Sequence, residues 1–187
     1  MFLLPGFLWL FLVLFMVHEF EEIILIAAWK RRNAEYLKTR NPTWTPYRAF
    51  LSTPSFCCAV AEEWILLAVV TAMSWASQNY FLWYGMLCGF AFHLVALHFA
   101  LTFIFRRYVP GLITAALIFL PCLLMLWIGA RDLHYAPLMV ALSALMGVAI
   151  AMVNLRTIHS AMPRFVRLLD GFSRGGGVRE ESAQTPE

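Results

Sequence analysis

Three ionisable side chains lie within an otherwise apolar N-terminal stretch: His18, Glu21 and Glu22. On a helix of about 3.6 residues per turn, positions i, i+3 and i+4 share one face, whereas Glu19 points elsewhere. An imidazole and two carboxylates on one face can bind a divalent metal ion or transfer protons. A purely structural alternative is hydrogen bonding between helices by protonated carboxyl groups. We favour a functional site, because three ionisable groups are a costly way to pair apolar helices.

More polar residues occur in later apolar stretches. Glu62 and Glu63 are adjacent, so they diverge by about 100° on a helix, and we expect one of them, preferably Glu62, to face the first cluster. His93 and His98 lie five residues apart, roughly 140° around a straight helix. Both imidazoles therefore reach one centre only if the helix is distorted or the site is broad.

A final pair of polar residues, Asn154 and His159, has the same spacing and lies near the cytoplasmic end of the last apolar stretch. We expect these two side chains to line a substrate entrance. The stretch at 110–129 contains no ionisable residue, and we expect it to be a lipid-facing strut.

The composition around these residues predicts a membrane protein. Of the 187 residues, 61% are hydrophobic and only 13% are charged, which is more apolar surface than a soluble core buries. A helix needs roughly 20 residues to cross a hydrocarbon layer of about 30 Å. The stretches that meet this length are residues 2–28, 55–75, 81–105, 110–129 and 136–156. The predicted fold class is all-α, an integral membrane bundle of about five transmembrane helices, because lipid excludes unpaired backbone groups and no barrel-like alternation occurs.

The basic residues predict the orientation of this bundle. They follow the first, third and fifth stretches, whereas the opposite loops are nearly free of net charge. By the positive-inside rule, the N-terminus is outside and the C-terminus is cytoplasmic. The net charge of +3 then reflects topology and not affinity for nucleic acid. We expect a multi-pass protein of the cell membrane, or of the inner membrane in a Gram-negative bacterium.

The chain divides into a membrane part and a short remainder. We expect residues 1–160 to form the transmembrane domain, with a cytoplasmic connection at 30–54 whose aromatic and basic residues suit lipid headgroups. Residues 161–187 are expected to form a short amphipathic segment and then, from about Gly171, a disordered cytoplasmic tail. The expected partners are the lipid bilayer and a hydrophobic small molecule, and the sequence also allows a homo-oligomer.

Depth in the membrane links the candidate residues on different helices. Counted from the cytoplasmic boundaries at about 1.5 Å per residue, Glu22, Glu62 and His98 lie roughly 10 to 12 Å deep. His18 and His93 lie roughly 16 to 18 Å deep. The similar levels indicate a common region in the cytoplasmic half of the bundle.

Residues 18–22, HEFEE, resemble the signature of the HXXEE-domain family of polytopic membrane proteins, which has no settled activity. The resemblance extends to a separate intramembrane glutamate, here Glu62 or Glu63, and to an Asn-x4-His element, here Asn154 and His159. It covers most of the chain up to about residue 160. The resemblance implies a polar cluster similar to an active site, without indicating a reaction.

Together, these patterns predict a metal centre in the cytoplasmic half of the bundle. The candidate ligands are His18, Glu21, Glu22, Glu62, Glu63, His93 and His98, of which the first four are also the candidate catalytic residues. Imidazole and carboxylate ligands suit zinc, iron or manganese. The first hypothesis is a metal-dependent membrane enzyme, hydrolytic or oxidative, that acts on a lipid or another hydrophobic molecule.

Two other classes of function use the same residues. Without metal, His18 and a glutamate could move protons in an isomerase of a membrane lipid or in a proton-coupled carrier. The outer halves of the stretches are nearly all apolar or aromatic, which counts against ion translocation. The third class is a non-catalytic accessory subunit, whose polar cluster only determines how helices pair.

Overall fold

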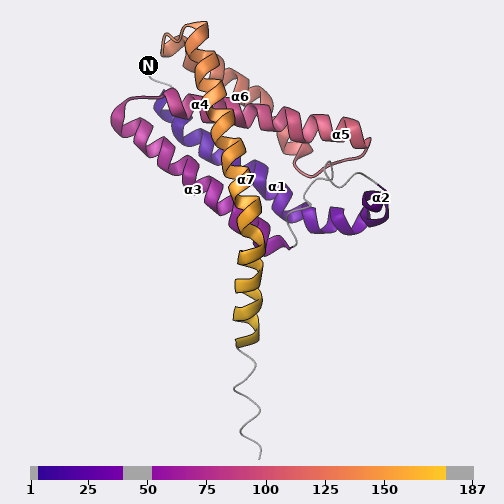
Figure 1. Ribbon diagram of the computed structural model, residues 1–187. Coiled ribbons are helices and arrows are strands. Elements are labelled where there is room, and N and C mark those ends of the chain that lie inside the picture. The colour runs from indigo at the N-terminus through magenta and orange to yellow at the C-terminus, as the bar shows by residue number, and fades with distance from the viewer. Residues whose placement is uncertain (1–3, 40–51, 176–187) are drawn as a thin grey trace, which may run out of the picture.

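The computed structural model describes residues 4–39 and 52–175, and every element in these two ranges is a helix (Figure 1). The elements are α1 (Leu4–Arg32), α2 (Ala34–Lys38), α3 (Thr53–Ser77), α4 (Phe81–His93), the π-helix η2 (Leu94–Phe99), α5 (Ala100–Phe105), α6 (Leu112–Asp132) and α7 (Pro137–Gly175). Since α4, η2 and α5 follow one another without a gap, they form one long helix over residues 81–105. The all-α fold class is therefore confirmed.

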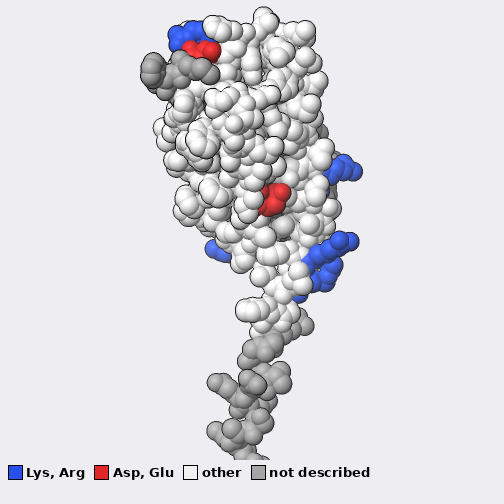
Figure 2. Space-filling view, turned by 90° about the vertical axis from the view of Figure 1, so that its left-hand side faces the viewer, with Lys and Arg blue, Asp and Glu red and all other residues white. Residues whose placement is uncertain are grey.

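Four helical stretches among the described residues are long and apolar enough to cross a membrane: α3, the helix at 81–105, α6, and α7 as far as Ser173. Their outer faces carry large exposed apolar side chains, such as Phe103, Leu117 and Leu138. Figure 2 shows a largely uncharged surface over the body of the molecule, with most of the visible basic residues near one end. These are the properties of a membrane protein. Because α1 is not among the four, a fifth span stays a prediction, as does the orientation of the termini.

Helix α1 lies against α3, α4 and α6, and one of its faces is buried along most of its length. The buried positions on this face recur every three or four residues: Leu4, Leu8, Phe11, Phe15, His18, Glu22, Ile26 and Trp29. This spacing matches the helical repeat of 3.6 residues. In the N-terminal half of α1, the ring of Phe11 packs against the rings of Trp83 and Phe90 in α4. The same periodicity therefore carries two polar side chains, His18 and Glu22, into the interior.

Small residues allow α4 to approach α7 closely. A Cβ atom built on Gly85 would lie 2.3 Å from the Ser143 carbonyl oxygen, and one on Gly89 would lie 3.3 Å from the backbone of Gly147. The Ser143 hydroxyl also donates a hydrogen bond of 2.7 Å to the Phe81 carbonyl. The glycine ridge of α4 thus packs the helix that carries His93 tightly against α7.

The last helix is longer than the predicted span. Helix α7 begins at Pro137 and continues to Gly175, past Gly171, where the sequence indicated the start of a tail. The rest of the predicted tail, residues 176–187, lies outside the described residues, as do residues 40–51 of the predicted cytoplasmic connection.

Candidate metal centre

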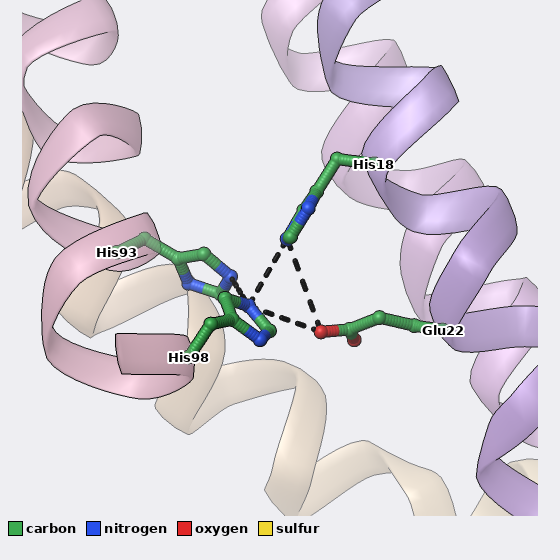
Figure 3. A group of neighbouring side chains, drawn as sticks. All are labelled: His18, Glu22, His93 and His98. Carbon is green, nitrogen blue, oxygen red and sulfur yellow. Dashed lines mark hydrogen bonds and ion pairs between the residues drawn. The ribbon is translucent and has the colours of Figure 1, made fainter. Parts of the chain in front are cut away.

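Four side chains, His18, Glu22, His93 and His98, converge between α1 and the junction of α4 with η2 (Figure 3). One nitrogen or oxygen atom from each lies within 4.8 Å of those of the other three. His98 Nε2 is 3.0 Å from His18 Nε2, 3.1 Å from His93 Nε2 and 3.1 Å from Glu22 Oε1. His18 Nε2 is 3.9 Å from Glu22 Oε1. In a tetrahedral site with bonds of about 2.0–2.1 Å, the ligand atoms are about 3.3 Å apart. The group could therefore hold a divalent metal ion.

The centre is almost fully enclosed by the protein. The exposed fractions of His18, Glu22 and His98 are 0%, 4% and 1%, whereas His93 is half-buried. A buried carboxylate among neutral imidazoles is costly unless a positive charge compensates it. His93 is the least buried of the four residues.

The π-helix η2 brings His93 and His98 together. It spans Leu94–Phe99, the segment that begins just after the first histidine and contains the second. Its i→i+5 hydrogen-bonding pattern widens the helical turn, so residues five apart lie on nearly the same face. This local change of helix type supplies the distortion that the five-residue spacing requires, and no broad site is needed. Single π-turns of this kind occur frequently at functional sites.

Hydrogen bonds at the far ring nitrogens indicate the tautomers of two histidines. His98 Nδ1 is 2.9 Å from the carbonyl oxygen of Pro110, which can only accept, so we assign the ring proton to Nδ1. His18 Nδ1 is 2.9 Å from the Thr114 hydroxyl, whose own proton is donated to Glu21 Oε2 at 2.6 Å. The proton of His18 is therefore also assigned to Nδ1. Two Nε2 lone pairs then meet at 3.0 Å, a repulsive contact that a cation between them converts into coordination.

Glu21 supports the centre from outside the ligand group. Its carboxylate accepts hydrogen bonds from the backbone N–H groups of Ile113 and Thr114 at the start of α6 and from the Tyr108 hydroxyl. A helix N-terminus has unpaired N–H donors and favours a negative charge, so Glu21 anchors α6 against α1. Burial and the adjacent Glu21 carboxylate raise the pKa of Tyr108, which keeps its hydroxyl protonated as a donor. Glu21 is not among the four residues whose donor atoms converge, and its carboxylate is bonded to the start of α6, so its role as a ligand stays a prediction.

The loop before α6 closes over the centre at a glycine. Gly111 has a φ angle of +86°, in the left-handed region that favours glycine. A Cβ atom built there would lie 2.4 Å from His98 Cε1 and 2.8 Å from Glu22 Oε1. A residue without a side chain is therefore required for the loop to approach both ligands. The expectation that 110–129 is only a lipid-facing strut is wrong, since Thr114 and Gly111 contact the centre.

Glu62 and Glu63 do not join the four-residue group. Glu62 is exposed, and its Oε2 accepts a hydrogen bond of 3.0 Å from Asn154 Nδ2 of α7. Glu63 interacts electrostatically with Glu62 and with Glu19, which is itself buried and interacts with Glu22. The packing of α3 turns Glu62 toward α7, away from the four-residue group, so the preference for Glu62 at the metal centre stays a prediction.

The predicted entrance residues occupy different surroundings on α7. Asn154 is half-buried at its contact with Glu62, whereas His159 is exposed. Their role at an entrance stays a prediction.

Sequence reasoning missed the supporting residues Tyr108, Pro110, Gly111 and Thr114. A single threonine or tyrosine carries no pattern, and Pro110 contributes only its backbone carbonyl. The dipeptide Pro110-Gly111 is a turn signal that could have marked a tight loop here, but not its contact with the histidines.

Comparison with known proteins identifies the family. The family model described as a protein of unknown function with an HXXEE motif matches residues 9–126, a range that contains His18, Glu22, His93, His98 and Thr114. No curated protein and no solved structure matches the chain. Since the family model covers more than half of the 187 residues, the chain belongs to the HXXEE family.

Proposed function

We propose that this HXXEE-family protein is a metal-dependent membrane enzyme, hydrolytic or oxidative, that acts on a lipid or another hydrophobic molecule. One observation carries the proposal: three imidazole nitrogens and one carboxylate oxygen converge at the spacing of a divalent metal site. The apolar outer faces of the helices support a substrate that arrives through the bilayer.

The donor set supports zinc, iron or manganese. Imidazole nitrogen and carboxylate oxygen suit all three metals, whereas calcium and magnesium prefer oxygen ligands alone. Three neutral imidazoles add no charge, so Glu22 is the only charged ligand, and a divalent ion would compensate it within the apolar interior.

The residues of the chain prepare this site for an ion. Pro110 and Thr114 hold the rings of His98 and His18 so that both Nε2 atoms face the centre. Such hydrogen bonds to the outer nitrogen orient the ring and raise its basicity as a ligand. A bound divalent ion with a coordination position beyond these four ligands would supply Lewis acidity and would lower the pKa of a water molecule there. The half-buried His93 leaves the side from which a substrate could approach.

The experiment that tests the metal site is elemental analysis of protein purified in mild detergent, before and after supplementation with zinc, iron or manganese. We expect close to one equivalent of metal in the wild type and almost none in His18→Ala. His159→Ala is the matched control, because it removes an exposed histidine outside the four-residue group, and it should retain the metal. Wild-type protein that holds no metal after supplementation would refute the metal site.

Activity requires a separate measurement. Metal-loaded protein is incubated with a membrane lipid extract, and the lipids are analysed by mass spectrometry for cleavage by water or for gain of oxygen. We expect product from the wild type and none from His18→Ala. A stoichiometric metal without turnover of any lipid, with and without added oxygen and reductant, would contradict the enzymatic part and leave a structural metal site.

One observation favours a metal-free alternative. His98 Nε2 and Glu22 Oε1 are 3.1 Å apart, which is also the geometry of an imidazolium–carboxylate pair. Such a pair could transfer protons in an isomerase or a proton-coupled carrier. This alternative predicts isomerised lipid or proton flux in liposomes from metal-free protein, and both should be lost in His98→Gln. A non-catalytic accessory subunit predicts neither result.

A further inference from the structure

A second polar site lies on the outside of the bundle, where α3 meets α7. Glu62 is exposed, and one of its carboxylate oxygens accepts the hydrogen bond from Asn154 Nδ2. Its other oxygen bonds to none of the residues in 4–39 and 52–175. Glu62 lies nine residues after Thr53, the first residue of α3, or about 13 Å along the helix axis. The carboxylate is therefore well inside the candidate membrane span and not at its end.

Two adjoining cavities extend from this pair along the two helices. The one on α3, of about 410 Å³, is lined by Cys58, Ala61, Glu62, Ile65, Leu66 and Val69. The one on α7, of about 360 Å³, is lined by Leu66, Ala149, Ile150, Val153, Asn154 and Thr157. Because Leu66 lines both, we treat them as one depression and name it the lateral groove. Each part falls within the size range of small-molecule sites, about 300–1,000 Å³.

The lateral groove has an apolar lining and one carboxylate, that of Glu62, which no basic side chain among the described residues pairs with. Beside Glu62, the described residues that line it are almost entirely apolar, and none of them is a lysine, arginine or histidine. The ion pairs found in the described part of the chain do not involve Glu62. A charged side chain costs about 2.5–3.5 kcal/mol or more at the centre of a membrane unless a partner meets it.

We propose that the lateral groove binds a membrane amphiphile that carries a protonated amine at its polar end. The ammonium group donates to the free Glu62 oxygen and to the Asn154 carbonyl oxygen, and the apolar chain lies along Ile65 and Val69. A positive charge is favoured over a neutral hydroxyl because the groove offers a carboxylate without a basic neighbour. This site is distinct from the metal centre, and the proposal does not rest on bound metal.

The test uses full-length protein in a neutral detergent and three probes of equal chain length: dodecylamine, dodecanol and dodecanoic acid. Binding is followed by native mass spectrometry and by the shift in thermal stability. We expect wild type to bind the amine at least tenfold more tightly than the other two probes. Glu62→Gln should abolish this preference, and Asn154→Ala should weaken binding of the amine while some preference remains.

Glu35→Gln is the matched control, because Glu35 is an exposed acid on α2 that pairs with Lys38, and it should behave as wild type. Equal binding of the three probes, or an unchanged preference in Glu62→Gln, would overturn the proposal. A wild-type dimer that dissociates in Glu62→Gln, with no preference for the amine, would show that a second copy of the chain fills the groove instead. Metal content is measured on the same samples. A preference for the amine in protein that binds no metal would contradict the metal site and leave the proposal for the lateral groove intact.

Discussion

Two glutamates in the same bundle, Glu22 and Glu62, have opposite surroundings. Glu22 is 4% exposed and faces three imidazoles, whereas Glu62 is exposed and has one amide partner, Asn154. The two histidines beside Glu22, His18 and His98, are held by hydrogen bonds that their Nδ1–H groups donate to the Thr114 hydroxyl and to the Pro110 carbonyl. Several helices meet around Glu22 and place imidazole ligands for a cation beside it, whereas Glu62 has a single hydrogen-bond partner among the described residues.

The two surroundings also call for different ligands. The metal centre is small, and its donor atoms lie within 4.8 Å of one another, which suits a single ion. The lateral groove is open and mostly apolar, with cavities of about 410 and 360 Å³, which suits a molecule with a chain. If this distinction is correct, substitutions at the centre change metal binding strongly and those at the groove change it little.

The largest effect on this comparison is expected from His98→Ala. His98 Nε2 contacts donor atoms of the other three ligands, so its loss opens the whole group. Removal of partners in the outer layer of a metal site typically costs 10–100-fold in affinity, and loss of this ligand should exceed about 100-fold. Competition titration with a chromophoric chelator measures the change. If His98→Ala bound the metal as tightly as the wild type, the histidines would not hold the ion, and the contrast between the surroundings of Glu22 and Glu62 would have no functional meaning.

The next largest effect is expected from Gly111→Ala. The added methyl group would meet His98 and Glu22, and the left-handed backbone alone costs alanine about 1–2 kcal/mol. Both metal affinity and the free energy of unfolding should fall. Gly171→Ala is the matched control: nothing lies within 4 Å of its added Cβ, so metal binding should be unchanged. Equal metal affinity in the two variants would show that the loop does not contact the centre.

A smaller effect is expected from Thr114→Val, which removes the hydroxyl between Glu21 and His18 while keeping a similar shape. We expect metal affinity to fall by about 10–100-fold with the protein still folded. Thr157→Val serves for comparison, since in the described part of the chain the Thr157 hydroxyl bonds to the Val153 carbonyl of its own helix and not to the four-residue group. Unchanged affinity in Thr114→Val would mean that the His18 ring needs no support from α6.

The smallest effect is expected from Glu62→Gln. Because Glu62 is outside the ligand group, metal affinity should change by less than about twofold, as for sites without shared partners. The same chelator titration measures it. A large loss of metal in Glu62→Gln would remove the distinction between the two glutamates and restore Glu62 as a ligand.

The class of the molecule and the position of its first polar cluster follow from the sequence alone. A high apolar content requires lipid, and backbone pairing in lipid requires helices. The spacing of His18 and Glu22 placed both on one face of α1. This conclusion needs only the helical repeat of 3.6 residues, which can be applied to the sequence without knowledge of the fold. The five-residue spacing of His93 and His98 also indicated that an ideal α-helix would not bring both imidazoles to one compact centre.

The choice of residues that share the centre depends on how the helices pack. The π-helix η2 brings His98 beside His93, and the start of α6 takes Glu21 away from the ligand group. The packing of α3 directs Glu62 outward to α7. Each outcome depends on helix type, tilt and rotation relative to neighbouring helices. Helix tilt and rotation are set by contacts between residues far apart in the chain, such as those of Gly111 with His98 and Glu22. The periodicity of a single helix gives no information about such contacts.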